Sequence, residues 1–178
     1  AIYKQGEQAR SAGKTADAVA AFQRVGTVAP QSQVRATAQY DAAAAMLTLK
    51  DWDGATKSLE DFRQRYPNHP LQAEVGGKLA LAYIEKGQWA GAAGELERLA
   101  ASTADAKVAR DAQWQAAEYY EKAKARPQAV QAWERYVAKH PAPLEPAIEA
   151  RHHLVTLAKQ GGDTAREAAL QRDILQAD

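Results

Sequence analysis

Residues 52–67 read WDGATKSLEDFRQRYP, and they carry the pattern that decides the fold. Within this stretch Ala55 is followed four residues later by Leu59 and twelve residues later by Pro67. The same alanine returns at a constant interval of 37 residues, as Ala18, Ala55, Ala92 and Ala129. A period of roughly 20 to 50 residues is typical of proteins in which similar units stack in a row. We therefore interpret the chain as a repeat protein.

Two further columns keep the same step. Each alanine is followed at the fourth position by a bulky apolar side chain, namely Phe22, Leu59, Leu96 and Trp133. A proline closes three of the four repeats, as Pro30, Pro67 and Pro141. The alanines allow two helices to approach closely, and the bulky column fills the space one turn further along. Because no helix pair could bury its apolar face alone, stacking of the pairs is expected to make the chain fold.

The helical spacing of apolar residues predicts ten helices in five antiparallel pairs. The expected helices span residues 1–11, 15–27, 33–49, 52–66, 71–86, 89–101, 105–124, 127–140, 146–160 and 164–176. Left-handed turn residues are expected at Gly13, Gly87 and Gly161–Gly162, and helix caps at Asp51 and Asp163. The residues expected to pack in the third pair are Leu79, Ala80, Tyr83 and Ile84, then Trp89, Ala92, Ala93, Leu96 and Leu99. Five aromatic residues at such spacing are assigned structural roles: Trp52, Tyr83, Trp89, Tyr120 and Trp133.

Composition narrows the classes of function. The chain has 23 Lys and Arg against 22 Asp and Glu, so a basic surface for nucleic acid is not expected. Its apolar runs are far shorter than the roughly 20 residues of a spanning helix, so this segment is not expected to insert into a membrane. The lack of cysteine excludes disulfides, thiolate metal ligands and a cysteine nucleophile. Because the chain begins with Ala1 and not methionine, we expect a processed form or a piece of a longer protein.

The pattern resembles the tetratricopeptide repeat, a helix–turn–helix unit of about 34 residues. Its small and bulky slots in the first helix are filled here by Ala43/Met46, Ala80/Tyr83 and Ala117/Tyr120, and the first repeat has Gly6 and Ala9. The last repeat departs from the pattern, with Arg166 in the alanine slot and Leu170 in the bulky slot, as a capping repeat would. The resemblance implies an all-α, right-handed superhelical solenoid of about five antiparallel helix pairs. It would form a single domain over 1–178, with repeats at 1–30, 33–67, 70–104, 105–141 and 144–178.

The extra residues of each repeat lie around the closing proline, as in residues 62–70 and 136–141. Long repeats that end in such an aromatic-x-x-x-Tyr-Pro phrase are similar to those of bacterial cell-envelope tetratricopeptide proteins. Examples are the outer-membrane assembly lipoprotein and the coordinator of the Tol–Pal system. This resemblance implies the periplasm or the periplasmic face of the outer membrane, with the cytoplasm as the alternative.

Tetratricopeptide proteins usually bind peptides along the groove formed by the first helices of their pairs. The helical face next to the core gives the candidate groove residues Tyr40, Glu74, Gly77, Leu81, Glu85, Trp114, Glu118, Glu121, Lys122 and Arg151. One column follows the repeat step through Tyr3, Tyr40, Gly77, Trp114 and Arg151. Large aromatic side chains suit the apolar anchors of a partner, because they bury much area at little cost in rotamer entropy.

Each of these residues also has a plainer interpretation. Tyr40 and Trp114 could pack only against neighbouring helices. Gly77 could form a gap for an inserted side chain, but close helix packing is the favoured alternative. The carboxylates of Glu85, Glu118 and Glu121 could accept a basic or amphipathic segment, or they could form a solvated face.

Catalytic and metal-binding patterns are nearly absent. Glu149 and His152 lie three residues apart on one expected helix, which is a spacing that metals accept, but no third ligand is evident. Gly161–Gly162 lacks the following Lys-Ser/Thr of a phosphate-binding loop. The sequence therefore predicts no metal, no cofactor and no catalysis.

The function predicted is a non-catalytic scaffold that binds a partner helix or extended peptide. The alternatives are a structural segment of a longer repeat protein, which could self-associate through its repeat ends, and an accessory module of an enzyme whose catalytic domain lies elsewhere.

Overall fold

The computed structural model describes residues 1–177, which form ten α-helices and no strand. Contacts between residues divide the chain into two compact units, residues 1–88 and residues 89–178. Asp178, the last residue of the fifth expected repeat, lies outside the described residues. The single continuous domain expected over 1–178 stays a prediction. Among residues 1–177, no helix combines the length and the apolar character that crossing a bilayer requires.

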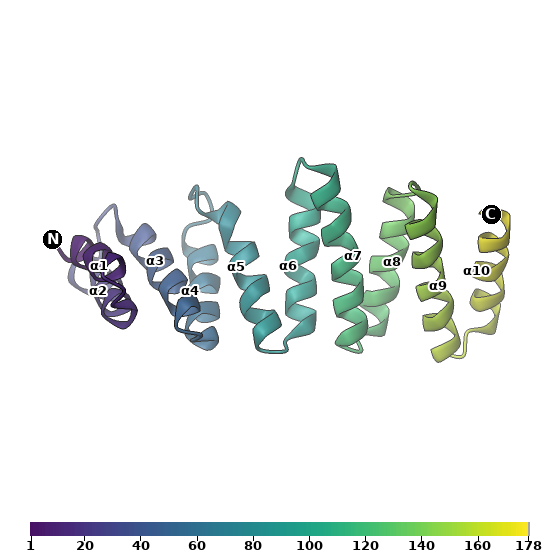
Figure 1. Ribbon diagram of the computed structural model, residues 1–178, viewed down its shortest axis with the longest axis horizontal. Coiled ribbons are helices and arrows are strands. Elements are labelled where there is room, and N and C mark those ends of the chain that lie inside the picture. The colour runs from purple at the N-terminus through teal and green to yellow at the C-terminus, as the bar shows by residue number, and fades with distance from the viewer. Residues whose placement is uncertain (178) are drawn as a thin grey trace. The chain divides into compact units, whose positions relative to one another are not determined.

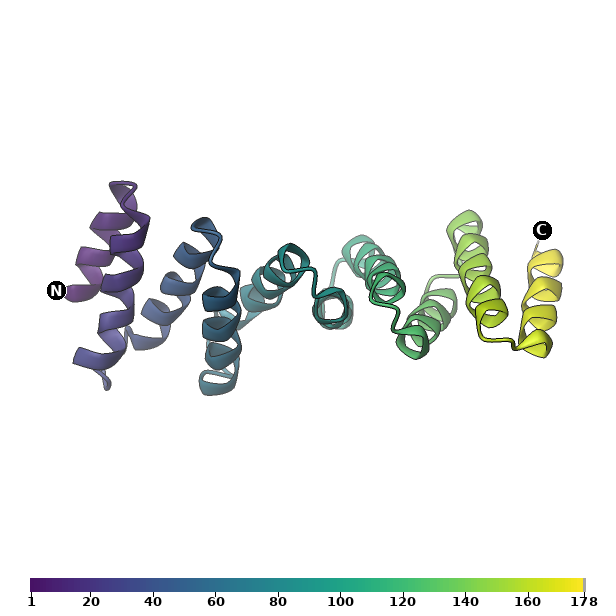
Figure 2. The same cartoon turned by 90° about the horizontal axis from the view of Figure 1, so that it is seen from below.

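In each unit every helix packs against the next one along the chain, and short connections join them (Figures 1 and 2). The first unit contains α1 (Ile2–Ser11), α2 (Thr15–Val28), α3 (Arg35–Thr48), α4 (Trp52–Arg65) and α5 (Gln72–Glu85). The second unit contains α6 (Trp89–Ser102), α7 (Ala106–Lys122), α8 (Arg126–Lys139), α9 (Leu144–Gln160) and α10 (Thr164–Ala177). All ten expected helices are present, and each end lies within two residues of its expected position.

The turn inside every helix pair contains one residue with left-handed backbone. Gly13, Gly87 and Gly162 have φ values of 72°, 68° and 71°, and Lys50 and Lys124 have φ values of 60° and 57°. Positions 13, 50, 87 and 124 follow the 37-residue step, so the turn geometry repeats even where the residue is lysine. The expectation for Gly161 is wrong, because its φ of −86° is helical and Gly162 alone makes the left-handed turn.

Two aspartates cap the helices that follow them, as expected. The Asp51 carboxylate accepts a hydrogen bond of 3.0 Å from the backbone N–H of Gly54 at the start of α4. Asp163 accepts one of 2.9 Å from the N–H of Arg166 in α10. Each bond satisfies a donor that the first turn of a helix leaves free.

The repeat columns form the cores of both units. All four column alanines are fully buried, and so are the bulky residues Phe22, Leu59 and Trp133. Tyr120 is also buried, whereas Trp52, Tyr83 and Trp89 are half-buried. The columns therefore act as the sequence predicts.

Leu99 is an exception to the expected packing. It occupies the slot of Phe62 and Tyr136 in other repeats, but its side chain is 39% exposed. In those repeats the slot holds an aromatic ring that packs on another ring four residues later, Tyr66 or His140. The third repeat has Thr103 at that place, so the shorter leucine lacks this partner.

Gly77 does not support the close packing expected for it. It is exposed on α5, and a Cβ atom built there would meet no heavy atom within 4 Å. Gly6 on α1 is the opposite case, because it is buried and its Cβ would lie 2.5 Å from the Phe22 ring. Of these two glycines, Gly6 is the one that a close approach requires.

These two glycines should respond oppositely to the same substitution. We expect Gly77→Ala to raise the free energy of unfolding of the first unit by about 1 kcal/mol, because alanine favours the helix. Gly6→Ala should lower it by about 1–3 kcal/mol, because the new methyl group would displace the Phe22 ring. Urea denaturation followed by circular dichroism measures both changes. Two changes of the same sign would contradict this account of Gly6.

Candidate partner-binding site

The expected groove residues lie on the first helices of their pairs, in two separate sets. Tyr40 on α3 and Glu74, Gly77, Leu81 and Glu85 on α5 belong to the first unit. Trp114, Glu118, Glu121 and Lys122 on α7 and Arg151 on α9 belong to the second unit.

In the first unit Tyr40 is a packing residue. It is 6% exposed, its ring centroid lies 5.9 Å from that of Phe62, and its hydroxyl donates a 2.5 Å hydrogen bond to Glu74. The Lys78 ammonium lies 5.6 Å from the centre of the Tyr40 ring. Burial and the bond to Glu74 raise the pKa of Tyr40. The hydroxyl therefore stays protonated and fastens α3 to α5.

Tyr3, one repeat earlier in the same column, is bonded in a similar way. Its hydroxyl donates a 2.6 Å hydrogen bond to Asp41 on α3, and Arg10 lies 3.3 Å from the other oxygen of that carboxylate. Burial and the Asp41 carboxylate raise the pKa of Tyr3 to about 12. Tyrosines of this column thus join successive first helices through carboxylates.

The remaining candidates of the first unit are open to a partner. Leu81 is 46% exposed, and Gly77 and Glu85 are exposed on the same helix. Gly77 precedes Leu81 by four residues, so both lie on one face of α5. On this face the apolar side chain of Leu81 lies next to Gly77, where the backbone has no side chain.

In the second unit Trp114 lines a cavity of about 330 Å³. The other walls are formed by Arg110, Asp111, Tyr136, Pro143, Pro146 and Glu149. The half-buried Trp114 indole packs edge-on against Trp133 and Tyr136, with ring centroids 4.7 and 5.1 Å apart. Trp114 is therefore held in place by the core while it borders a cavity with charged walls.

Glu121 is bound inside the second unit. One of its carboxylate oxygens accepts a 2.5 Å hydrogen bond from the Trp133 indole N–H and lies 2.7 Å from Nδ1 of His153. The His153 ring stacks on Trp133, with centroids 4.2 Å apart. This cluster, the Glu121–Trp133–His153 triad, connects α7, α8 and α9.

The triad shifts the protonation of both of its titratable members. The pKa of His153 lies above its ordinary value of 6.5, chiefly because of the hydrogen bond to Glu121. Burial alone would raise the pKa of Glu121, but the bonds from His153 and Trp133 outweigh burial and bring it below 4.5. The charged pair is therefore the favoured state near pH 6.

This pair should make the stability of the second unit depend on pH. The stability that His153 contributes is complete below about pH 6.5 and is lost as the pH rises through its folded pKa. The stability that Glu121 contributes is complete above about pH 4.5 and is lost as the pH falls through its folded pKa. We expect the free energy of unfolding to be greater at about pH 5.5 than at about pH 8, by up to about 1 kcal/mol. Urea denaturation at both pH values measures the difference. His153→Gln should remove or reverse it, because burial lowers the pKa of His140 and that group favours the higher pH. An unchanged difference in that variant would argue against the pair.

The other candidate residues of the second unit differ in whether their side chains are free to contact a partner. The Lys122 ammonium lies 3.5 Å from the centre of the Trp89 ring, and Arg151 donates a 3.0 Å hydrogen bond to the carbonyl of Ala147 in its own helix. Glu118 is exposed and has no ion pair within the described chain. A partner would therefore meet Glu118 as a free charge.

Sequence reasoning missed His153, although a signal for it existed. His153 follows Ala42, Leu79 and Ala116 at the repeat step, and these three residues are buried. The column predicts an inward direction for His153, whereas the neighbouring His152 is exposed. Within residues 1–177, no three His, Cys, Asp or Glu side chains are grouped so that they could hold a metal ion, and Glu149 and His152 are both exposed.

Comparison with known proteins agrees with the repeat pattern. Residues 1–76 match the model of the outer membrane lipoprotein family YfiO, and residues 111–142 match a tetratricopeptide repeat model. No curated protein matches the chain.

Several solved structures are similar over nearly the whole chain. A MamA protein is 18% identical with a TM-score of 0.55, and the match covers 99% of this chain and 89% of that one. Residues 41 to the end of MamA from Desulfovibrio magneticus RS-1 are 16% identical with a TM-score of 0.55, with coverage of 99% and 92%. A putative kinesin light chain from Podosopora anserina with TPR-like repeats is 18% identical with a TM-score of 0.51, again covering 99% and 92%.

These matches confirm the resemblance to tetratricopeptide repeat proteins and the all-α solenoid class. At such identities the structural likeness concerns the fold. Together with the family matches, it supports a repeat scaffold of the kind that binds other proteins.

Proposed function

We propose that this chain is a non-catalytic scaffold that binds a partner helix or extended peptide along its first helices. The observation that carries the proposal is Trp114, which the core holds beside a 330 Å³ cavity. Such a preformed surface binds without first having to become ordered, which reduces the cost of association.

The chemistry of this surface suggests the partner's chemistry. An apolar side chain that enters the cavity would bury area against the Trp114 indole. Glu118 on α7 and Glu149 on α9 are exposed, and Glu149 lines the cavity, so these carboxylates would attract a basic residue beside that anchor. In the first unit, the exposed Leu81 beside Gly77 on α5 is a separate apolar contact. From the second unit we infer a partner segment that places an apolar side chain next to a basic residue.

The bacterial envelope is the proposed location, on the periplasmic side. The match of residues 1–76 to an outer membrane lipoprotein family supports this location.

Affinity capture from envelope extract tests the proposal. Leu81→Ser and Glu118→Arg change exposed first-helix residues and leave the core intact, so they are better probes than Tyr40, which is buried. Leu99→Ser is the matched control, because Leu99 is similarly exposed, at 39% against 46% for Leu81, but lies on the second helix α6. We expect a partner that the wild type and the Leu99 variant retain and the two first-helix variants lose.

Titration of that purified partner should then show at least about tenfold weaker binding for the first-helix variants. Equal binding by all four proteins would refute the first-helix site. Loss with the Leu99 variant alone would move the site to the second helices.

Stacking of another repeat or a second copy on α10 is a second candidate function. Leu175 on this helix is 77% exposed, a larger fraction than for the other exposed large apolar side chains of the described chain. Concentration-dependent association in sedimentation that Leu175→Ser abolishes would support it, and a monomer at all concentrations would exclude self-association.

A further inference from the structure

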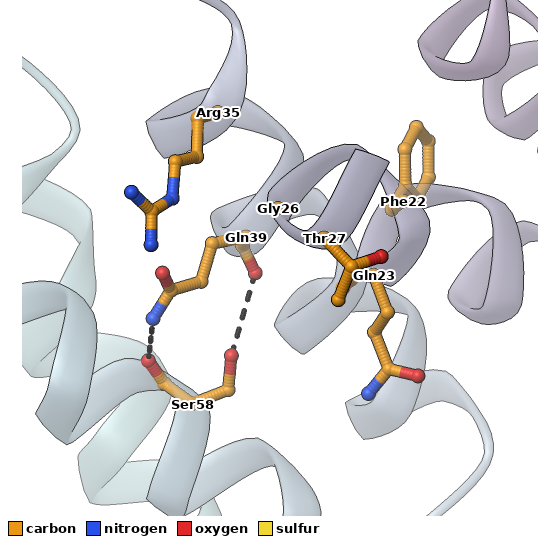
Figure 3. A pocket seen from close by; sticks show the side chains of 8 residues that line it. Phe22, Gln23, Gly26, Thr27, Arg35, Gln39 and Ser58 are labelled. Carbon is orange, nitrogen blue, oxygen red and sulfur yellow. Dashed lines mark hydrogen bonds between the residues drawn. The ribbon is translucent and has the colours of Figure 1, made fainter. Parts of the chain in front are cut away.

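Two adjoining cavities lie between α2, α3 and α4 of the first unit, away from the first-helix residues discussed above. One has a volume of about 310 Å³, and the small residues Gly26 and Ala42 are among those that line it. Figure 3 shows this cavity from close by. The other has a volume of about 530 Å³ and shares Gln23, Gln39 and Ser58 with the first. We call the two together the second-helix trough.

The carboxylates of the trough are already engaged. One oxygen of Asp61 lies 2.8 Å from the Arg65 guanidinium, and the other accepts a 2.7 Å hydrogen bond from the Gln39 amide. Asp51 caps α4 through the N–H of Gly54. Within the described residues, neither acid forms an ion pair with Arg35 or Lys57.

Two cations of the trough have no anionic partner. The half-buried Arg35 guanidinium donates one 3.0 Å hydrogen bond to the carbonyl of Pro30 and forms no ion pair with another described residue. Lys57 is exposed in the second cavity and forms no ion pair within residues 1–177. Figure 3 shows the Arg35 side chain extending from the start of α3 towards Gln39. The remaining N–H groups of Arg35 are thus free to bind a ligand at the edge of the cavity.

The amide and hydroxyl groups around Arg35 determine which hydrogen-bond donors and acceptors the ligand needs besides its carboxylate. Both amide hydrogens of Gln39 point to acceptors, Asp61 and the carbonyl of Ser58, which leaves its oxygen as an acceptor. The Thr27 hydroxyl donates to the carbonyl of Arg24 and can still accept. Gln23 forms no side-chain hydrogen bond within the described residues and can both donate and accept. A peptide backbone supplies donors and acceptors to match these groups.

We propose that the second-helix trough is a second binding site, and that it takes an acidic peptide segment whose carboxylate pairs with Arg35. A planar guanidinium binds a carboxylate through two parallel hydrogen bonds, which fixes orientation as well as charge. Lys57 attracts a second acidic group of the same segment. This site shares no residue with the candidate residues on the first helices. Its ligand is acidic, whereas the partner proposed for those helices carries a basic residue.

NMR titration of the full 15N-labelled chain tests the site. The probe is the capped pentapeptide acetyl-Gly-Glu-Leu-Glu-Gly-amide, and its matched control has glutamine in place of both glutamates. We expect saturable shifts of the Gln23, Thr27 and Gln39 signals with the acidic peptide only. An uncapped glutamine peptide with a free C-terminal carboxylate distinguishes a chain terminus from an acidic side chain as the source of the anion.

Three variants separate the site from general electrostatic attraction. Arg35→Gln should weaken binding at least about tenfold, because it removes the bidentate pair. Gly26→Leu should weaken it similarly by filling the cavity, and the open space around Gly26 lets the protein fold. Arg24→Gln removes the same charge from an exposed position on α2 and should change binding less than about twofold.

Equal affinity of the Arg35 variant and wild type, or equal binding of the glutamate and glutamine capped peptides, would overturn the proposal. Phosphatidylglycerol vesicles provide the last comparison. If vesicles shift the trough signals and the acidic peptide does not, the trough is a membrane-contact site and the peptide proposal fails.

Discussion

Trp133→Ala is expected to lower the free energy of unfolding of the second unit by about 3–5 kcal/mol. The indole is fully buried, stacks on His153 and packs against Trp114 and Tyr136. Its removal leaves a large cavity and also takes one hydrogen-bond donor away from Glu121. Guanidinium denaturation followed by far-ultraviolet circular dichroism measures the loss.

Trp133→Phe separates the two causes. Phenylalanine keeps most of the ring but has no N–H, so we expect a loss of about 1–2 kcal/mol. If Trp133→Ala cost less than about 1 kcal/mol, Trp133 would not be the centre of this core.

Phe62→Ala should have an effect of similar size in the first unit, about 3–5 kcal/mol. Phe62 is fully buried, and its ring centroid lies 5.9 Å from that of Tyr40, 5.2 Å from that of Tyr66 and 5.4 Å from that of His69. The substitution would leave three rings without their common neighbour. Tyr40 would lose the packing that directs its hydroxyl to Glu74, so the connection between α3 and α5 should weaken as well.

Tyr66→Phe is the control for this ring cluster. The Tyr66 hydroxyl is buried and has no hydrogen-bond partner in the described residues. Its removal keeps the ring and relieves an unsatisfied polar group, so stability should be unchanged or rise by about 1 kcal/mol. A large loss on Tyr66→Phe would show that the hydroxyl has a partner, and a small loss on Phe62→Ala would contradict the central place of Phe62.

The helices and the core columns could be predicted because each sequence pattern recurs in several repeats. A single alanine such as Ala55 means little, but four alanines at one interval leave few alternatives to a stacked helix pair. Leu99 shows where the rule fails. In this slot Phe62 and Tyr136 are buried together with a second ring four residues later, and Val25 is buried without one, whereas Leu99 stays partly exposed.

The candidate site was less predictable, because it depends on contacts between distant segments. Glu121 and His153 are 32 residues apart, and nothing near Glu121 in sequence shows that its carboxylate is occupied by Trp133 and His153. The sequence predicts Tyr40 as a groove candidate with packing as the alternative, and it does not show that Glu74 binds the Tyr40 hydroxyl. The sequence does not predict the trough at Arg35. The trough forms where small residues on three helices meet, and small residues that lie far apart in sequence form no recognisable motif.

The left-handed lysines of the turns also make folding cooperativity measurable. Lys50 lies in the first unit and Lys124 in the second, and both are in a backbone conformation that favours glycine. Lys50→Gly and Lys124→Gly should each stabilise by about 0.5–1 kcal/mol without altering any packed surface. If either substitution moves one common unfolding transition, the ten helices melt as a single cooperative block. If each moves only its own transition, the chain behaves as two tandem folding modules that can open one at a time.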